Sequence, residues 1–174
     1  NHLSGRGGEW GLFGRSPWAQ RGIALTVRHV EVVPDGSGIE AAARKLRYGA
    51  FAALEADFVA LAHHLDDQVE TFLLQLLRGA GAKGLSGMPV IRQQQSAAGG
   101  QPAPLILRPL LEMRRSRLEA YAKSRQLAWV EDDSNGDSRF DRNYLRNELL
   151  VQLDARFPAY RETLARAARN LADY

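Results

Sequence analysis

The stretch FVALAHHLDDQVETFLLQLLRGAG, residues 58–81, decides the fold. Its first five residues, FVALA, form a short apolar run of the kind that a buried parallel strand carries. From 66 to 78 the apolar residues recur with helical spacing. This apolar stripe consists of Val69, Phe72, Leu73, Leu76 and Leu77. Gly79 and Gly81 then end the helix, so the stretch predicts a strand, a tight turn and a helix with one buried face.

Strands and helices alternate along most of the chain. We expect further strands at 23–33, 105–110 and 127–131, where apolar and β-branched residues lie between turn signals. We expect further helices at 39–54 (capped by Ser37), at 111–126 (with Leu118, Tyr121 and Ala122 facing inward), at 143–156, and after Pro158. This alternation indicates an α/β fold with a mostly parallel sheet flanked by helices.

Composition narrows the class of protein. The chain has 174 residues, enough for one domain with a hydrophobic core. It contains no cysteine, which excludes disulfides, zinc fingers and thiolate or iron–sulfur chemistry. No apolar run approaches the roughly 18 residues of a membrane span, so a cytoplasmic location without a membrane partner is expected. The net charge of +3 permits an anionic partner without requiring one.

The N-terminal part differs from the rest. Residues 1–20 carry five glycines and show neither helical nor strand periodicity. We therefore expect 1–21 to be a poorly readable N-terminal remnant, and 22–174 to be a single domain that ends in a helical segment.

The polar residues that follow FVALA are the main candidates for chemistry. Ligands of parallel sheets bind where a strand turns into the next helix, and His63, His64, Asp66 and Asp67 lie at that turn, with Glu70 shortly after. Mg²⁺ binds through one or two carboxylates plus substrate phosphates, so Asp66 and Asp67 are candidate metal ligands. A plainer interpretation is that these acids only stabilise the first turn of the helix. Two adjacent histidines and two adjacent acids at this edge favour a binding site.

Glycines and arginines nearby are weaker candidates. The backbone at Gly79 and Gly81 can approach a phosphate, although a helix end and a flexible turn explain these glycines better. Arg78 suits either an anion or the carbonyl end of the helix. Arg44 and Arg47 share one helical face and form either a phosphate clamp or a solvated pair.

The segment EDDSNGDSRFDRNYLRN, residues 131–147, is the second cluster. Asp133 and Asn135 lie in a turn-prone run, and Arg142 and Arg146 follow on one helical face. The run DSN usually caps a turn or a helix, and the acids and arginines of this segment can also pair with one another.

Four segments, in this order, resemble consecutive signature segments of the tRNA(Ile)-lysidine synthetase family. They are AHHLDDQVET, LLRGAGAKGLSGM, ILRPLLEMRRSRLEAYA and WVEDDSNGDSRFDRNYLRNELL, and GIEAAARKLRYGAF resembles the segment before them. The resemblance covers about residues 22–171. It implies the adenine nucleotide α-hydrolase-like fold of the PP-loop ATP pyrophosphatases, a Rossmann-like arrangement in three layers.

The chemistry of that family has two steps. ATP adenylates the C2 oxygen of the wobble cytidine of tRNA(Ile) with a CAU anticodon, and pyrophosphate leaves. The amine of free L-lysine then displaces AMP, which gives lysidine. The resemblance therefore implies an ATP-dependent ligase that uses ATP and Mg²⁺ and takes tRNA(Ile) and L-lysine as partners; it leaves a homodimer open.

The resemblance also implies roles for single residues. The catalytic set is His63, His64, Asp66, Asp67 and Arg44. The set that binds lysine or tRNA is Arg47, Glu70, Arg78, Arg108, Asp133, Asn135, Arg142, Asn143 and Arg146, with Gly79 and Gly81 near the nucleotide. One family motif, the nucleotide-binding loop SGGxDS, is absent from this sequence. We therefore expect the chain to begin after the first strand–helix–strand unit, to bind ATP weakly, and to owe its activity to a longer parent enzyme.

Three other interpretations compete with this one. The related tRNA thiolases generally rely on cysteines, which this chain lacks. HHxDD also suggests an HD-type metal phosphohydrolase, but such a site needs further ligands, and only His2 and His29 remain as histidines. A noncatalytic RNA-binding module would bind tRNA through its arginines without needing Asp67.

Overall fold

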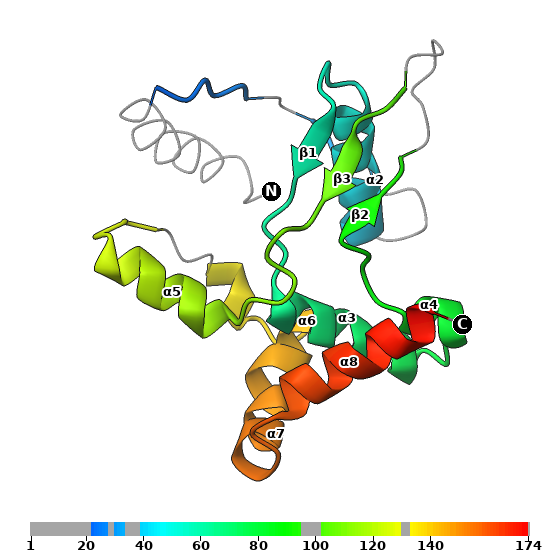
Figure 1. The fold of residues 1–174 in the computed structure, drawn as a ribbon, viewed down its shortest axis with the longest axis vertical. Helices are drawn as coiled ribbons and strands as arrows, with labels where there is room; N and C mark the ends of the chain where they lie inside the picture. The colour runs from blue at the N-terminus through cyan, green and yellow to red at the C-terminus, as the bar shows by residue number, and fades with distance from the viewer. Residues whose placement is uncertain (1–21, 28–29, 34–38, 95–101, 130–132, 174) are drawn as a thin grey trace. The chain divides into compact units, whose positions relative to one another are not determined.

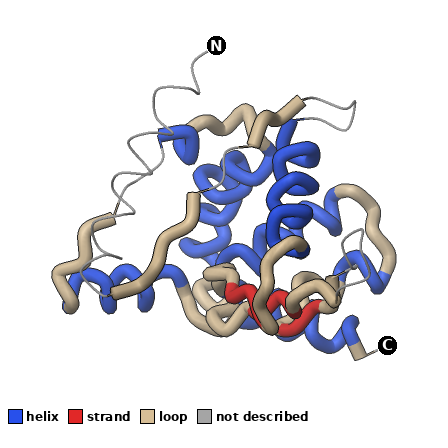
Figure 2. The backbone as a smooth tube through the Cα atoms, turned by 90° about the horizontal axis from the view of Figure 1, so that it is seen from above, coloured by secondary structure: helices blue, strands red, loops and turns tan. Residues whose placement is uncertain are grey.

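The computed structural model describes residues 22–27, 30–33, 39–94, 102–129 and 133–173. The chain divides into two compact units, residues 1–48 with 128–131 and residues 49–127 with 132–174, and we describe each by itself. Among the described residues, no helix is both long and apolar enough to cross a membrane. Helices account for most of the regular structure, and the strands are short (Figure 2).

The first unit contains most of α2, Ile39–Ala52, which starts where the sequence predicts a helix. The predicted cap, Ser37, lies outside the described residues. The strand expected at 23–33 is wrong where the structure describes it, because 23–27 and 30–33 form no strand. A β-branched run becomes a strand only when a neighbouring strand takes up its backbone hydrogen bonds. Within the described residues, this run has no such neighbour.

The second unit contains a three-stranded sheet of order β1-β3-β2, formed by Phe58–Ala60, Leu105–Leu107 and Ile91–Arg92 (Figure 1). β1 pairs with β3 in parallel, as expected, and β2 pairs with β3 antiparallel. The described sheet is therefore mixed, and β2 was not predicted. The strand expected at 127–131 is also wrong at 127–129, which form a loop; residues 130–131 lie outside the described part.

Burial follows the order of the strands. Ile106, in the central strand β3, is fully buried, whereas Phe58 in β1 is 55% exposed. FVALA was expected to be buried on both faces, and this is wrong: Phe58, Ala60 and Ala62 are exposed, and Val59 and Leu61 are half-buried. The reason is the place of β1 at the edge of the described sheet, where only one neighbouring strand covers it.

The helices of the second unit follow the predicted order. The chain passes from α3, Leu65–Leu77, through the unpredicted α4, Ala82–Leu85, to α5, Arg115–Ser124. The helix expected at 143–156 is present, but it is divided into α6 (Asp141–Tyr144), the π-helical turn η2 (Leu145–Leu149) and α7 (Leu150–Arg156). The short 3₁₀ turn η1, Asp133–Gly136, precedes it, and α8, Tyr160–Ala172, follows Pro158 as predicted.

The hydrophobic core joins α3, α7 and α8. Val69, Leu150 and Tyr160 form its buried centre, with Leu73, Leu153 and Leu164 packed around them, and α8 runs along α3 (Figure 1). The predicted stripe of α3 is confirmed at Val69, Phe72 and Leu73 but wrong at Leu76 and Leu77, which are 49% and 70% exposed. Helical periodicity says which face of a helix turns inward, not how far the neighbouring helix extends.

The inward face predicted for the 111–126 helix is only partly right. Leu118 and Ala122 are half-buried, whereas Tyr121 is 58% exposed. The helix is also shorter than expected: α5 runs over Arg115–Ser124 and not over 111–126.

A buried amide connects α3 to the loop that follows α4. The side chain of Gln68 donates to the Met88 carbonyl at 2.9 Å and accepts from the Met88 N–H at 2.8 Å. Gly87, directly before Met88, has a φ of +71°, and a Cβ at this position would lie 2.9 Å from the Gln68 amide. The close approach explains why glycine is needed here, because any side chain would collide with Gln68 as well as strain the backbone.

We expect Gly87→Ala to lower the free energy of unfolding by about 2 kcal/mol, through backbone strain plus a displaced Gln68 amide. Gly79→Ala is the matched control, because Gly79 has a similar φ of +72° but no neighbouring atom within 4 Å of the place that an alanine methyl group would take. Urea unfolding of both variants separates the two effects. Equal losses would show that Gln68 does not clamp this loop.

Candidate functional site

The turn from β1 into α3 is built around His64, the N-cap residue of α3. Its Nδ1 accepts from the Asp67 N–H at 3.4 Å, and the Asp67 Oδ2 accepts from the His64 N–H at 3.0 Å. This reciprocal pair is a capping box, which satisfies backbone donors at the start of the helix. The next N–H, that of Leu65, donates to the Met113 carbonyl at 2.9 Å. Asp67 therefore has the structural role that the plainer interpretation assigns to the acids, and His64 has a structural role as the N-cap residue.

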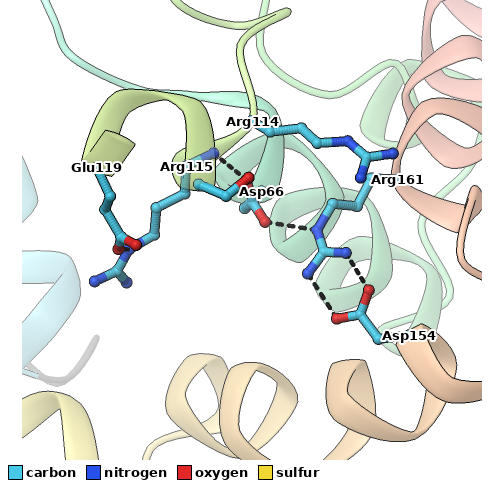
Figure 3. A pocket seen from close by; sticks show the side chains of 7 residues that line it. Asp66, Arg114, Arg115, Glu119, Asp154 and Arg161 are labelled. Atoms are coloured by element: carbon cyan, nitrogen blue, oxygen red, sulfur yellow. Dashed lines mark hydrogen bonds and ion pairs between the residues drawn. The ribbon is translucent and has the colours of Figure 1, made fainter. Parts of the chain in front are cut away.

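Asp66, whose Oδ2 lies 3.8 Å from Nδ1 of His64, reaches toward Arg115 of α5 and Arg161 of α8 (Figure 3). Its Oδ2 accepts from the backbone N–H of Arg115 at 2.8 Å, and its Oδ1 accepts from Nε of Arg161 at 2.6 Å. Burial alone would raise the pKa of Asp66, but these two donors outweigh burial and hold the pKa below its usual value. Asp66 is therefore a charged acceptor in this structure.

Glu70 lies one turn further along α3 and is the most deeply buried acid of the turn. Its side chain is 1% exposed, and Arg146 forms a two-pronged pair with it, Nε to Oε1 at 2.7 Å and NH2 to Oε2 at 3.0 Å. Nε of Arg142 lies 3.0 Å from Oε2, and NH2 of the same side chain donates to Thr71 at 2.9 Å. The two arginines come from α6 and η2, so the predicted second cluster meets the predicted first cluster here.

We call Asp67, Glu70, Arg142 and Arg146 the acid–arginine cluster. Asp67 belongs to it because its Oδ1 lies 4.0 Å from NH2 of Arg146. The hydrogen bond to Glu70 raises the pKa of Arg146, against the opposing effect of burial. The cluster holds two carboxylates and two guanidinium groups, and paired charges of this kind can be buried at a tolerable cost. The two arginines are its more accessible members, with 31% of the Arg142 side chain and 25% of the Arg146 side chain exposed, and Asp67 is the more accessible of the two acids at 16%.

Several predicted residues lie near this cluster in other roles. Arg78 pairs with Asp141 on the surface at 3.2 Å. Asn143 donates to the Asp137 carbonyl at 3.0 Å, and the Asn135 carbonyl accepts from Asn147 at 2.9 Å. Asp133 is the first residue of η1. These contacts order the segment that carries Arg142 and Arg146.

The remaining predicted residues lie elsewhere. Arg108 is 1% exposed and donates to the Pro89 carbonyl at 2.8 Å. Gly79 and Gly81 lie in the turn between α3 and α4, which agrees with the interpretation that they end the helix. His63 is half-buried in the turn before α3. Arg44 and Arg47 belong to the first unit, where both are exposed on α2 and Arg44 lies 4.9 Å from the Tyr48 ring centroid.

Sequence reasoning missed the arginines around Asp66. A pocket of ≈ 300 Å³ beside this residue is lined by Arg114, Arg115 and Arg161 together with Glu119 and Asp154. Two adjacent arginines at the start of a helix are unfavourable next to the positive end of the helix dipole. Arg114 and Arg115 therefore indicated, from the sequence alone, that acids lie nearby to compensate their charge. Glu162 accepts from Arg114 at 2.5 Å and Glu119 accepts from Arg115 at 2.8 Å. Arg161 carried no such signal.

The predicted metal ligands differ in what their oxygens do. Each Asp66 oxygen accepts a hydrogen bond from an N–H group, whereas Asp67 uses Oδ2 for capping and turns Oδ1 toward Arg146. Among the residues that the structure describes, no group of three or more histidines and acids is placed to hold a metal ion. A cation here would therefore need ligands from its substrate as well as from Asp67.

We expect Arg146→Met to lower the free energy of unfolding by about 3 kcal/mol, because it leaves the buried Glu70 with one guanidinium in place of two. Arg78→Met is the matched control: its ion pair with Asp141 is exposed at both ends, and the expected loss is under about 1 kcal/mol. Urea unfolding at neutral pH measures both. A loss at Arg146 no larger than that at Arg78 would contradict this account of the cluster.

Known proteins share this fold. A family model described as a PP-loop domain matches residues 3–153. The U34-tRNA thiolase NcsA from Methanococcus maripaludis, solved with its [4Fe-4S] cluster, superimposes with a TM-score of 0.68 at 14% identity, over 93% of this chain and 56% of that one. The likeness concerns the fold alone, and with the family match it confirms the expected adenine nucleotide α-hydrolase-like class.

Curated relatives are similar in sequence. The tRNA(Ile)-lysidine synthase of Chromobacterium violaceum is 48% identical over 152 residues, which are 87% of this chain and 34% of the relative. The synthase of Ralstonia nicotianae is 52% identical over 157 residues, and that of Nitrosomonas europaea 44% over 173. The chain spans about a third of the length of these relatives (34%, 32% and 37%).

Proposed function

Because the chain belongs to the PP-loop domain family, we propose that it forms the core of the catalytic domain of a tRNA(Ile)-lysidine synthase. The reaction is adenylation of the wobble cytidine of tRNA(Ile) by ATP, followed by attack of L-lysine. The observation that carries the proposal is the meeting of HHLDDQVET with RNYLR: Arg142 and Arg146 contact Glu70 across 72 and 76 positions of sequence separation, counted from the residue numbers. Similarity to curated synthases of several bacteria supports it.

The acid–arginine cluster suits the first step. Adenylation develops negative charge on the α-phosphate and on the departing pyrophosphate, and preorganised cations stabilise such charge. Glu70 holds Arg142 and Arg146 in fixed positions, so their guanidinium groups need no reorganisation when the phosphate arrives. The π-helical turn that carries Arg146 supports this role, because such turns occur frequently at functional sites.

Asp67 is the carboxylate best placed to meet a cation from solvent. It is more exposed than Glu70, and its Oδ1 has only the long 4.0 Å approach of Arg146 within the cluster. Mg²⁺ bound there with the substrate phosphates would neutralise the leaving pyrophosphate. The same carboxylate can receive the ammonium group of lysine, and Glu70 can join it only if Arg146 moves aside. His64 keeps Asp67 in place through the capping box.

The alternatives fit this chain less well. Sulfur insertion generally relies on cysteines, and the sequence contains none. An HD-type phosphohydrolase needs a cluster of histidines and acids around its metal, and the described residues contain no group of three or more suitable side chains. A cytoplasmic location, a homodimer, the catalytic role of Arg44, and substrate or tRNA contacts by Arg47 and Arg108 remain predictions.

The test uses a full-length protein that contains this chain, with ATP, labelled lysine and a tRNA(Ile) transcript with a CAU anticodon. We expect ATP-dependent incorporation of lysine, and a loss of at least about 100-fold in Asp67→Asn, because both cation roles need its charge. The matched control is Glu148→Gln, which changes an exposed acid outside the cluster and should leave the rate unchanged.

Two outcomes would count against this function. A folded full-length protein that incorporates no lysine would remove the assignment as a whole. Full activity in Asp67→Asn would leave the assignment standing but remove the role given to this carboxylate.

A further inference from the structure

Asp66 is the point where the first turns of three helices meet. Asp66 itself lies in the first turn of α3. Its Oδ2 accepts a hydrogen bond from the backbone N–H of Arg115, the first residue of α5, and its Oδ1 accepts one from Arg161 in the first turn of α8 (Figure 3). The N-cap residue of α5, Arg114, makes no capping hydrogen bond with its own side chain. Asp66 therefore takes the place of a cap for α5, and a carboxylate at a helix N-terminus is favourable.

Arg161 connects Asp66 to a second acid. Its NH1 and NH2 groups donate to the two oxygens of Asp154 at the end of α7, the latter at 2.8 Å, while Nε holds Asp66 at 2.6 Å. The Arg161 side chain is 17% exposed, and its guanidinium carbon lies 4.7 Å from the Tyr160 ring centroid. A planar guanidinium that donates in three directions fixes both acids at once. Arg161 is thus a bridge between α7 and the start of α3.

The two adjacent acids of HHLDD consequently do different work. Asp66 faces α5 and α8, with both oxygens held by N–H donors, whereas Asp67 faces the acid–arginine cluster. Any shift of Asp66 moves the backbone of the same helical turn, which carries Asp67 and the capping box with His64. Positions of catalytic groups matter at the scale of 1 Å.

Resting on the proposed function, we propose that Asp66 and Arg161 are a pair of positioning residues, which hold the first turn of α3 so that Asp67 is presented to the reacting groups. Asp66 is then no metal ligand. This assignment adds Arg161, from a segment outside all the clusters that the sequence indicated, to the residues on which the reaction depends.

The test is Arg161→Gln in the full-length protein, which removes the bridge and leaves the Asp66 carboxylate in place. We expect kcat for lysidine formation to fall about 10-fold through misplacement of Asp67. The KM for lysine and the Mg²⁺ concentration for half-maximal rate should rise, because Asp67 is the carboxylate proposed to meet both cations. If Asp66 were a metal ligand, removing its competing cation would instead lower the Mg²⁺ requirement. The matched control is Arg169→Gln, on the same helix, whose 3.8 Å contact with Glu112 is exposed; its kcat should not change.

Two further variants keep the test decisive if Arg161→Gln fails to fold. Asp154→Asn loosens Arg161 without touching Asp66 and should lower kcat about 3-fold, less than loss of the whole bridge. Arg161→Lys, which keeps one charged donor, should recover part of the rate. Active-site titration corrects each kcat for the folded fraction, so a loss of stability alone does not lower the corrected kcat.

The results separate this inference from the proposed function. An unvaried protein that makes no lysidine would sink the function itself. An active protein whose kcat stays unchanged in both Arg161→Gln and Asp154→Asn, or whose Mg²⁺ requirement falls in Arg161→Gln, would overturn the positioning role alone.

Discussion

Burying the carboxylate of Glu70 is the constraint around which the second unit is organised. An unpaired carboxylate in the interior costs several kcal/mol, and Glu70 has 1% of its side chain exposed. Arg146 and Arg142 meet this demand, but only if the segment of α6 and η2 lies against α3. The pairing therefore fixes the packing of two helical segments that are far apart in sequence, and it places the Arg146 guanidinium 4.0 Å from Asp67. One interaction serves both the fold and the proposed chemistry.

The other polar residues of α3 extend the same logic. Gln68 holds the loop at Met88, Asp66 holds the starts of α5 and α8, and Asp67 caps its own helix with His64. The apolar side of the helix meanwhile packs on Leu150 and Tyr160. A single helix with bonds to so many segments behaves as a rigid support, and a rigid support is what a site that stabilises transient charge requires.

Sequence patterns predicted features that depend on residues close in the chain, such as the ends of a helix. They failed for features that depend on residues distant in the chain, such as strand pairing and the role of a single carboxylate. The start and end of α3 came from local periodicity and from the glycines after it, to within one residue. Residues 23–33 carry an equally clear strand pattern, yet a strand needs a partner that local pattern does not supply. Asp66 and Asp67 are the same residue type at adjacent positions, so the local pattern assigned one role to both. Their difference comes from Arg115 and Arg161, which lie 49 and 95 positions away.

The claim that Glu70 and Arg146 join the two predicted clusters is tested most directly by a double-mutant cycle. Glu70→Gln, Arg146→Gln and the double variant are unfolded in urea, and the coupling free energy is taken from the four stabilities. A close, buried, two-pronged pair predicts a coupling of at least about 2 kcal/mol. Additive losses, with a coupling below about 0.5 kcal/mol, would mean that the two side chains are not in contact, and the site built on them would be wrong.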